Sequence, residues 1–229
     1  MDSYFKRYHK ESGWPPVCNP SSKQVEKDVK LEDFIPLRYS RVPGELAGGI
    51  QSRESSKSIG RDKGLDKDIL GTFLKWSVGA LEDETGRRAY PSAGQLYSNE
   101  LFIAVKEVAH LQPGLYKYHA NEHALTFVNG NNDVTDALVQ ESIEYNFCVI
   151  VAADLTYAVD QYGERGYRFC LMEAGHMVQN MQLVAVSLNK AIVPIGGFVD
   201  EYLNSSVLPG EADLSTLYLV PVGRKMDDV

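Results

Sequence analysis

The stretch Arg87-Arg88-Ala89-Tyr90-Pro91-Ser92-Ala93-Gly94-Gln95-Leu96-Tyr97-Ser98-Asn99-Glu100 is the segment around which the rest of the chain is organised. It opens with two guanidinium groups, continues with the rigid Pro91 and then offers three small residues. Small residues let the backbone approach a flat ligand closely. The amides of Ser92, Ala93 and Gly94 therefore suit ring oxygens, ring nitrogens or phosphate. The same residues also suit a plain turn between two ordered elements.

Length and composition place the chain among globular proteins. Its 229 residues suit one large domain or a domain with arms. A hydrophobic content of 44% and a charged content of 24% are ordinary for such a protein. The net charge of −8 and the pI of about 5.2 argue against nucleic acid or an anionic membrane surface as the main partner. A local basic site for one phosphate remains compatible with this charge.

The cysteines and the N-terminus restrict the chemistry and the location. The three cysteines, Cys18, Cys148 and Cys170, have no metal-site spacing, so no metal is expected. Cys148 and Cys170 lie in apolar runs and are predicted to be small core residues. The N-terminus has no apolar run behind it, and no run approaches ~18 apolar residues. We therefore expect a cytoplasmic protein without a signal peptide or a membrane span.

Periodicity along the chain predicts both helices and strands. Residues 1–50 are rich in Pro, Ser, Lys and Gly, which predicts an irregular arm with one short helix near its start, followed by a domain over 51–229. Apolar residues at helical spacing predict helices, and short apolar or alternating runs predict strands. The expected helices cover 65–80, 134–145 and 167–188, and the expected strands cover 100–105, 114–119, 123–128, 147–153, 191–198 and 217–222.

A second stretch is as informative as the first. Tyr162-Gly163-Glu164-Arg165-Gly166-Tyr167-Arg168 leads into Glu173-Ala174-Gly175-His176-Met177-Val178-Gln179-Asn180. Gly175 inside a helix costs about 1 kcal/mol relative to Ala, which indicates close packing against another helix or a cofactor. His176, Gln179 and Asn180 are expected to make polar contacts in the core or at an interface, and contact with a flavin or a substrate is the alternative.

Together with Pro91–Gly94, this string resembles the SagB/McbC branch of the nitroreductase family. These proteins are FMN-dependent dehydrogenases that oxidise thiazolines and oxazolines in modified peptides. The resemblance extends over residues 51–224, and Tyr8-His9-Lys10-Glu11-Ser12 matches more loosely a stretch that often precedes this domain. It implies an α+β fold in which helices wrap a central mixed or antiparallel sheet. It also implies a homodimer with FMN at the subunit interface.

The residues suggest where a phosphate and a ring would bind. Arg53 and Lys57 can hold a phosphate and Ser55 can donate to a phosphate or ribityl oxygen, although a solvated basic loop would look the same. The family carries Arg-x-Ser-x-Arg at this place, with Lys57 here in the position of the second arginine. The resemblance further implies that Pro91, Ser92, Ala93 and Gly94 line the flavin ring with Gly196 and Gly197. Arg224 completes the phosphate site or belongs to a plain basic tail.

The catalytic pair of the family is only half present. Peptide azoline oxidases carry a Lys-Tyr pair before the second helix, which is proposed to remove a Cα proton, and Gln161-Tyr162 stands at that position. A lysine with a lowered pKa can act as a base, whereas glutamine has no protonation change near neutral pH. Tyr162 is therefore the expected proton acceptor or donor, with water or Asp160 as a helper.

The resemblance implies a reaction and leaves two alternatives. The expected function is oxidation of a thiazoline, an oxazoline or a related unit in a peptide or a carrier-bound natural product, with oxygen reoxidising FMN. A cyclodehydratase or a carrier protein is the expected partner. The first alternative is an NAD(P)H-dependent reductase of nitro compounds or quinones. The second is a non-catalytic flavin-binding subunit of a biosynthetic complex.

Overall fold

The computed structural model describes residues 3–11, 45–56, 58–82, 85–139, 143–208 and 214–226. Cys18 and Lys57 lie outside these ranges, as does most of the N-terminal arm. Within the described ranges, no helix combines the length and the apolar character needed to cross a membrane.

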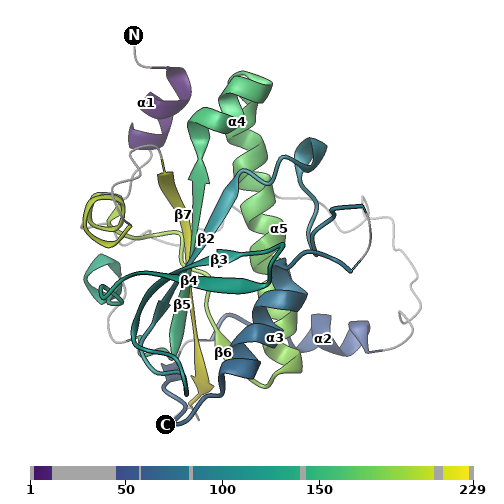
Figure 1. The fold of residues 1–229 in the computed structure, drawn as a ribbon, viewed down its shortest axis with the longest axis vertical. Helices are drawn as coiled ribbons and strands as arrows, with labels where there is room; N and C mark the ends of the chain where they lie inside the picture. Colours follow the sequence, from purple (N-terminus) through teal and green to yellow (C-terminus); the bar gives the residue numbers. More distant parts are fainter. Residues whose placement is uncertain are drawn as a thin grey trace, which may run out of the picture.

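An antiparallel sheet of seven strands forms the centre of the molecule (Figure 1). The strands follow the order β1-β7-β5-β2-β3-β4, with β6 paired to β7, and every pairing is antiparallel. The registers Ile103↔Val149 and Val149↔Val220 tie the three central strands together. The strand bounds are β1 Ile59–Gly60, β2 Asn99–Val105, β3 Gly114–His119, β4 Ala124–Asn129, β5 Phe147–Asp154, β6 Ala191–Ile192 and β7 Leu214–Lys225.

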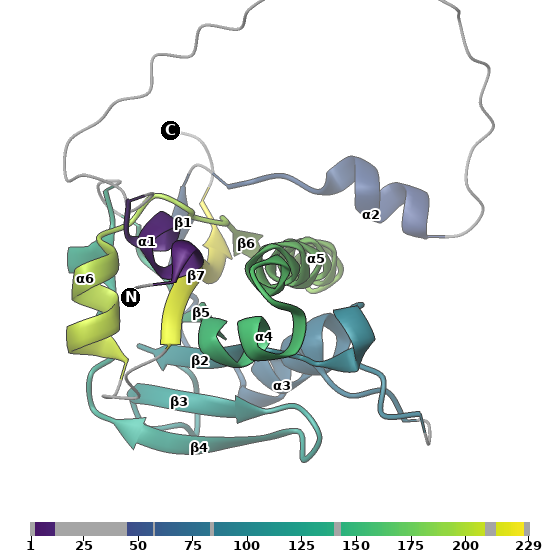
Figure 2. The ribbon, with the colours of Figure 1, turned by 90° about the horizontal axis from the view of Figure 1, so that it is seen from above.

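Helices cover both faces of this sheet. Seen from above in Figure 2, α3 and α5 lie on one side of the sheet and α6 on the other. The helix bounds are α1 Tyr4–Glu11, α2 Leu46–Ser52, α3 Lys67–Val78, α4 Leu155–Tyr162, α5 Arg165–Ser187 and α6 Asp200–Tyr202, which continues as a π-helical turn Leu203–Val207. This α+β architecture, with helices around an antiparallel sheet, confirms the predicted fold class.

The alternation of side chains along the strands builds two cores. Ile103 and Val149 face α3 and α5, whereas their neighbours Phe102 and Cys148 face the side of α6. Successive strand residues point to opposite faces of a sheet, so one buried strand serves both cores. Burial raises the pKa of the Cys148 thiol to about 12, as expected of a small core residue.

The long helices begin and end near their predicted limits. The Asp66 carboxylate accepts the Asp68 amide and caps α3. Leu70, Phe73 and Leu74 of that helix are buried against the sheet. α5 starts two residues earlier than the predicted helix over 167–188 and ends one residue earlier.

The predicted helix over 134–145 is wrong. Only Thr135–Ala137 form a short 3₁₀ turn, and residues 140–142 lie outside the described ranges. Asp133 accepts the Thr135 amide, and the buried Tyr145 hydroxyl accepts the Val134 amide at 3.1 Å. The Ala137 carbonyl, which a continuing helix would pair four residues further along, accepts the Val199 amide at 2.9 Å instead, and Leu138 is extended with ψ 128°.

The predicted strand over 191–198 is regular only at β6. Pro194 has no amide hydrogen to donate to a ladder. Beyond it, the backbones of Ile195 and Leu219 exchange two hydrogen bonds, and Phe198 forms an isolated bridge with Leu138. The segment therefore follows β7 without forming a continuous strand.

Candidate active site

Tyr162 lies directly over the Pro91–Gly94 segment. It is the last residue of α4, and its hydroxyl donates to the Ala93 carbonyl at 3.2 Å. A side-chain carbon built on Gly94 would collide with the same hydroxyl oxygen. Two parts of the sequence-predicted site, 69 positions apart in the chain, are therefore in contact.

Local sequence explains how Tyr162 is held. The Asp154 carboxylate accepts the Tyr157 amide at 2.8 Å and caps α4, and Gly163, with φ 61°, ends the helix. The Tyr162 ring packs edge-on against Phe169 of α5, with centroids 5.1 Å apart. About two fifths of Tyr162 (39%) stays exposed, so a ligand can reach it. Gln161 beside it is exposed as well.

The segment after Pro91 folds into a tight turn. Ala93–Gln95 form a 3₁₀ turn, and the Ser92 hydroxyl oxygen accepts the Tyr97 amide at 2.9 Å. Gly94, Gln95 and Tyr97 all have positive φ, at 57°, 57° and 49°. Such φ values are uncommon outside glycine and are found where surrounding contacts enforce them. The turn leaves Pro91 and Gly94 exposed.

A buried carboxylate lies beneath this turn. Glu173 of α5 is only 3% exposed; it accepts the Asn99 amide at 3.1 Å and a hydrogen bond from the Ser92 hydroxyl. Burial raises the pKa of Glu173, and the bonds from Ser92 and Asn99 and the charges of Arg88 and His176 act against that rise. Glu173 therefore ties α5 to both ends of the turn.

Two further residues complete the support of the turn. Asn180 of α5 donates to the Ala89 carbonyl at 2.7 Å and to the Ser77 carbonyl of α3 at 3.3 Å, in agreement with the expected core contact. The Arg88 guanidinium lies 4.4 Å from the centre of the Tyr97 ring and donates to the Tyr90 hydroxyl at 3.0 Å. Burial raises the pKa of that hydroxyl above its usual value.

Glu173 is not among the predicted site residues, although its position in the sequence carries a signal. Glu173 stands on α5 between the buried Cys170 and Met177, at the spacing of a core face. A carboxylate at such a position is rarely buried without a partner. Its presence in an apolar stripe indicates a hydrogen-bonded role at the point where another segment crosses the helix.

The predicted phosphate stretch lies at the other end of α5. The Gln182 side chain donates to the Ser55 hydroxyl at 3.3 Å, and the Ser56 amide donates to the Ile192 carbonyl of β6 at 2.9 Å. Arg53 is half-buried and makes no ion pair with any described residue. Lys57, the third predicted residue here, lies outside the described ranges. Ser55 is thus held beside α5, and Arg53, at the end of α2, carries a guanidinium that is available to an anion.

Arg224 is not brought to this stretch. Its neighbour Lys225 pairs with Glu54, whereas Arg224 contacts Met226 and lines a hollow of about 500 Å³ with Arg61 and Lys63. The two residues are successive in β7 and therefore point to opposite faces.

Gly196 and Gly197 lie over β7. Gly196 is exposed and Gly197 is half-buried. A side-chain carbon on Gly196 would come within 3.9 Å of the Tyr218 ring, which packs on the same side of the sheet as α5. Gly196 therefore lies beside Tyr218, whereas the flanking Ile195 and Phe198 pack in the core on the α6 side. Among the described residues, no group of His, Cys, Asp and Glu side chains is placed to hold a metal ion.

Three features together define the class of protein: an antiparallel sheet, a long helix behind a glycine turn, and a stretch with serine and arginine. Residues 50–224 match the model of the nitroreductase family, and the chain belongs to that family. Protein MJ1384 of Methanocaldococcus jannaschii, which carries the name of a nitroreductase, is 32% identical over 207 residues, 88% of this chain and 94% of that protein.

Two further relatives concern microcin maturation. The microcin B17-processing protein McbC of Escherichia coli is 27% identical over 198 residues, which are 80% of this chain and 68% of McbC. A chain in the solved E. coli microcin synthetase complex McbBCD, with truncated pro-MccB17 bound, matches with a TM-score of 0.69 and 22% identity. That match covers 99% of this chain and 84% of the other, and at this identity it shows the shared fold.

Proposed function

We propose that the protein is an FMN-dependent dehydrogenase that oxidises a thiazoline, an oxazoline or a related unit in a peptide or carrier-bound natural product. Oxygen reoxidises the flavin in this proposal. The observation that carries it is the contact of the Tyr162 hydroxyl with Ala93 and Gly94. This contact supports a proton-transferring role for Tyr162, because family resemblance assigns the same turn to the flavin ring. The 27% identity to McbC, a microcin-processing protein, supports the same reading.

The residues present fit FMN. Arg53 offers a guanidinium that forms no ion pair with any described residue, and Ser55 offers a hydroxyl that accepts from Gln182. Exposed backbone at Gly94 and Gly196 lets a flat ring approach closely. We therefore assign the phosphate and ribityl chain to Arg53, Ser55 and Lys57, and the ring to Pro91–Gly94 with Gly196 and Gly197. FMN, when bound, supplies the acceptor for the two electrons.

The chain itself orients the ring and moves the proton. Glu173 and Asn180 hold the turn in one conformation, so its amides need no rearrangement when a ligand binds. A phenol can both donate and accept a hydrogen bond. We assign to the Tyr162 oxygen the proton that leaves the substrate carbon, while its own proton passes to water or to Asp160. Gln161 can hydrogen-bond the substrate but cannot take up the proton.

The alternative function is an NAD(P)H-dependent reductase of nitro compounds or quinones. It is favoured by one residue, Gln161, which stands where the azoline oxidases carry a lysine. A reductase needs no base at that position. Steady oxidation of NAD(P)H in the absence of any peptide would support this alternative.

Assembly is proposed on the same grounds. The microcin relative suggests a cyclodehydratase or a carrier protein as the partner that delivers the substrate. We further propose a homodimer through the exposed part of α5 from Met172 onward, with FMN at the subunit interface. Met172 is 52% exposed there, and a side-chain carbon on Gly175 would meet nothing of its own chain within 4 Å. The close packing expected at Gly175 is therefore left to a second copy or a cofactor.

The proposed function is tested by the visible absorption of the flavin. The purified protein is expected to show a flavin band near ~450 nm and to release FMN, identified by mass. Under anaerobic conditions, a synthetic thiazoline peptide is expected to bleach the band in a single turnover. Tyr162→Phe should slow the bleaching by about 10²–10⁴-fold, the usual contribution of a positioned acid–base group.

Other outcomes separate the candidates. A Tyr162→Phe rate equal to that of the parent protein would remove Tyr162 from the proton path. A protein that binds FMN but turns over neither azolines nor NAD(P)H would be a non-catalytic subunit. A colourless protein that cannot be reconstituted with FMN would overturn the oxidoreductase proposal.

A further inference from the structure

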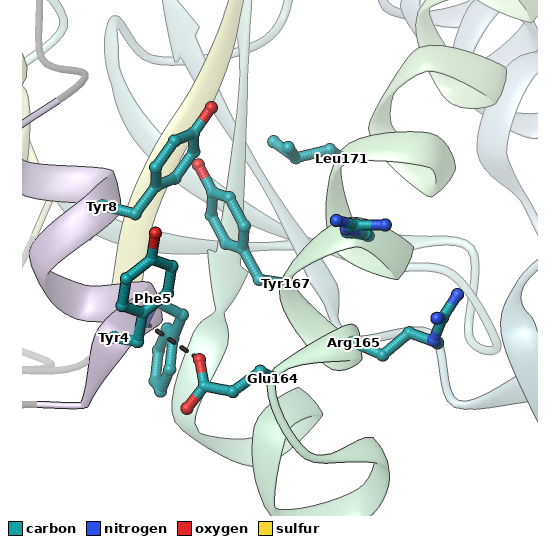
Figure 3. Close-up of a pocket in the computed structure, with 8 residues that line it drawn as sticks. Tyr4, Phe5, Tyr8, Glu164, Arg165, Tyr167 and Leu171 are labelled. Atoms are coloured by element: carbon teal, nitrogen blue, oxygen red, sulfur yellow. Dashed lines mark hydrogen bonds between the residues drawn. The ribbon is translucent and has the colours of Figure 1, made fainter.

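A groove separates α1 from the first turns of α5 (Figure 3). Its volume is about 610 Å³, within the range of roughly 300–1,000 Å³ that is usual for ligand sites. It is lined by Tyr4, Phe5, Tyr8, Glu164, Arg165, Tyr167, Arg168 and Leu171. The mechanism proposed above uses none of these residues.

The groove is built on a fixed frame. Phe5 is 4% exposed and packs in a small core with Tyr167 and Cys170. The Glu164 carboxylate accepts the Phe5 amide at 3.0 Å, which anchors the start of α1 to the start of α5. The Tyr8 ring meets the Tyr167 ring edge-on at 5.6 Å. The two walls are therefore held at a set separation.

The exposed lining has the composition of a recognition surface. Tyr4 is 74% exposed and Tyr8 51%, one turn apart on α1, and Leu171 faces them at 42%. Tyrosine and arginine are enriched where proteins bind partners. Tyrosine also supplies a large contact area at low conformational cost, together with a hydroxyl for the backbone of a bound peptide.

The charges of the groove are unbalanced. Arg165 and Arg168 are exposed, and neither forms an ion pair with any residue that the structure describes. Glu164, the carboxylate of the lining, accepts the Phe5 amide and keeps its negative charge, so two arginines and one glutamate give the lining a net charge of +1. In a chain with a net charge of −8, this is a local cationic site. A guanidinium without a partner matches a carboxylate in both charge and geometry.

The groove also adjoins the candidate active site. Arg165 points away from α1 (Figure 3) and stands one helical turn before Phe169, on which Tyr162 packs. An extended chain leaving the groove over Arg165 would therefore reach Tyr162.

We propose that this groove binds an acidic segment of the peptide substrate. This proposal rests on the function proposed above. Arg168 binds a carboxylate of the segment, and Tyr4, Tyr8 and Leu171 contact the neighbouring apolar side chains. Arg165 guides the chain from the groove toward Tyr162. The groove thus selects peptides with an acidic residue beside the heterocycle.

A second copy of the protein fits the groove less well than a peptide. A two-fold contact places the same patch on both subunits. The lining carries two arginines and one glutamate, so a contact between two copies would bring two net positive charges together, which is unfavourable. Two hollows placed face to face would also leave an unfilled space, which native interfaces avoid.

The test measures binding and flavin reduction separately on the FMN-loaded full chain. Two fluorescein-labelled thiazoline peptides differ only in two glutamates, replaced by glutamines in the second. We expect the glutamate peptide to bind about tenfold more tightly in fluorescence anisotropy, as is typical for a charge-assisted hydrogen bond. We expect this preference to shrink at high salt.

Variants assign the preference to the groove. Arg168→Glu should abolish the preference for the glutamate peptide, and Arg168→Lys should keep part of it. Lys63→Glu makes the same charge change at an exposed site outside the groove and should leave the preference intact. Tyr8→Ala should weaken both peptides equally.

The outcomes separate this proposal from the proposed function. Equal affinity for the two peptides, or an unchanged preference in Arg168→Glu, would overturn the proposed peptide-binding role of the groove. Flavin bleaching would still support the proposed function in that case. Selective binding without bleaching would overturn the function and leave an acidic-peptide site. If the protein binds both peptides equally and Arg168→Glu changes its sedimentation coefficient, the groove is a subunit contact and the proposal is overturned.

Discussion

At the residue scale, Gly94 meets two demands that no other amino acid satisfies together. Its φ of 57° lies in the left-handed region, and a side-chain carbon there would collide with the Tyr162 hydroxyl. The first demand concerns the backbone, since the left-handed conformation costs an L-residue about 1–2 kcal/mol. The second concerns the contact on which the candidate active site depends.

Replacing Gly94 separates these two demands when Gly64 serves as the control. Gly64 has φ 78° and open space around it, so Gly64→Ala should cost only the backbone strain of about 1–2 kcal/mol. Gly94→Ala adds the collision, so its loss in the free energy of unfolding should be larger. Urea denaturation measures both losses. Equal losses would mean that Tyr162 does not lie over Gly94 in solution.

The sequence predicted the tight turn but not its full conformation. Pro91, Ser92 and Gly94 are turn residues by local chemistry alone. Gln95 and Tyr97, which also have positive φ, carry no such signal. Tyr97 is held by contacts with Ser92 and with Arg88, nine positions away along the chain. Such contacts depend on the fold and cannot be seen in a local pattern.

At the element scale, α5 is the support of the candidate site. It contacts the turn through Glu173 and Asn180 and the phosphate stretch through Gln182. The sequence predicted this helix to within two residues at each end, because its apolar spacing is a local signal. The buried face of α5 does not follow hydrophobicity alone, since Leu171 is exposed and Glu173 is buried.

Strand alternation explains why Arg224 was harder to place. The predicted last strand ended at Val222, whereas β7 continues to Lys225. With three more residues in the strand, Arg224 and Lys225 take opposite faces. Lys225 then reaches Glu54 near the predicted phosphate stretch. An error of three residues in the predicted strand end therefore leads to a wrong prediction of which side chain faces the site.

Glu173 tests the link between α5 and the turn. Glu173→Ala would leave the buried Asn99 amide without its acceptor, at a cost of about 1–3 kcal/mol in the free energy of unfolding. Glu173→Gln keeps an acceptor oxygen and should cost less. Urea denaturation compares the two variants, and FMN affinity by fluorescence should follow the same order. Equal losses for Ala and Gln would argue against the hydrogen-bonded role.

The raised pKa of Glu173 also predicts a pH dependence. Between the ordinary pKa of 4.5 and the higher value in the folded protein, the folded state binds more protons than the unfolded state. The contribution of this group to stability is therefore greatest below pH 4.5 and falls as pH rises through the folded pKa. Glu173→Gln should remove this part of the pH profile. A wild-type profile parallel to that of Glu173→Gln would contradict the raised pKa.

At the scale of the whole molecule, the order of the strands in the sheet could not be predicted from the sequence. β7, the last strand, pairs with β1, β5 and β6, so the C-terminal segment closes the sheet over long chain separations. Local patterns find strands but do not say which of them pair. The resemblance of two motifs to a known family supplied the fold class, and the structure supplied the contact between Tyr162 and Gly94.

The proposed dimer makes the last prediction. Gly175→Glu places a carboxylate on the exposed side of α5, where no cation stands one turn away and burial against a second copy would strip it of water. Since 1.4 kcal/mol is tenfold in affinity and an unpaired buried charge costs more, the dimer dissociation constant should rise by at least about tenfold. Phe127→Glu introduces the same charge at a 51% exposed residue of the edge strand β4 and should leave the dimer intact. Sedimentation velocity measures both, and a parent protein that binds FMN while sedimenting as a monomer would refute the proposed interface.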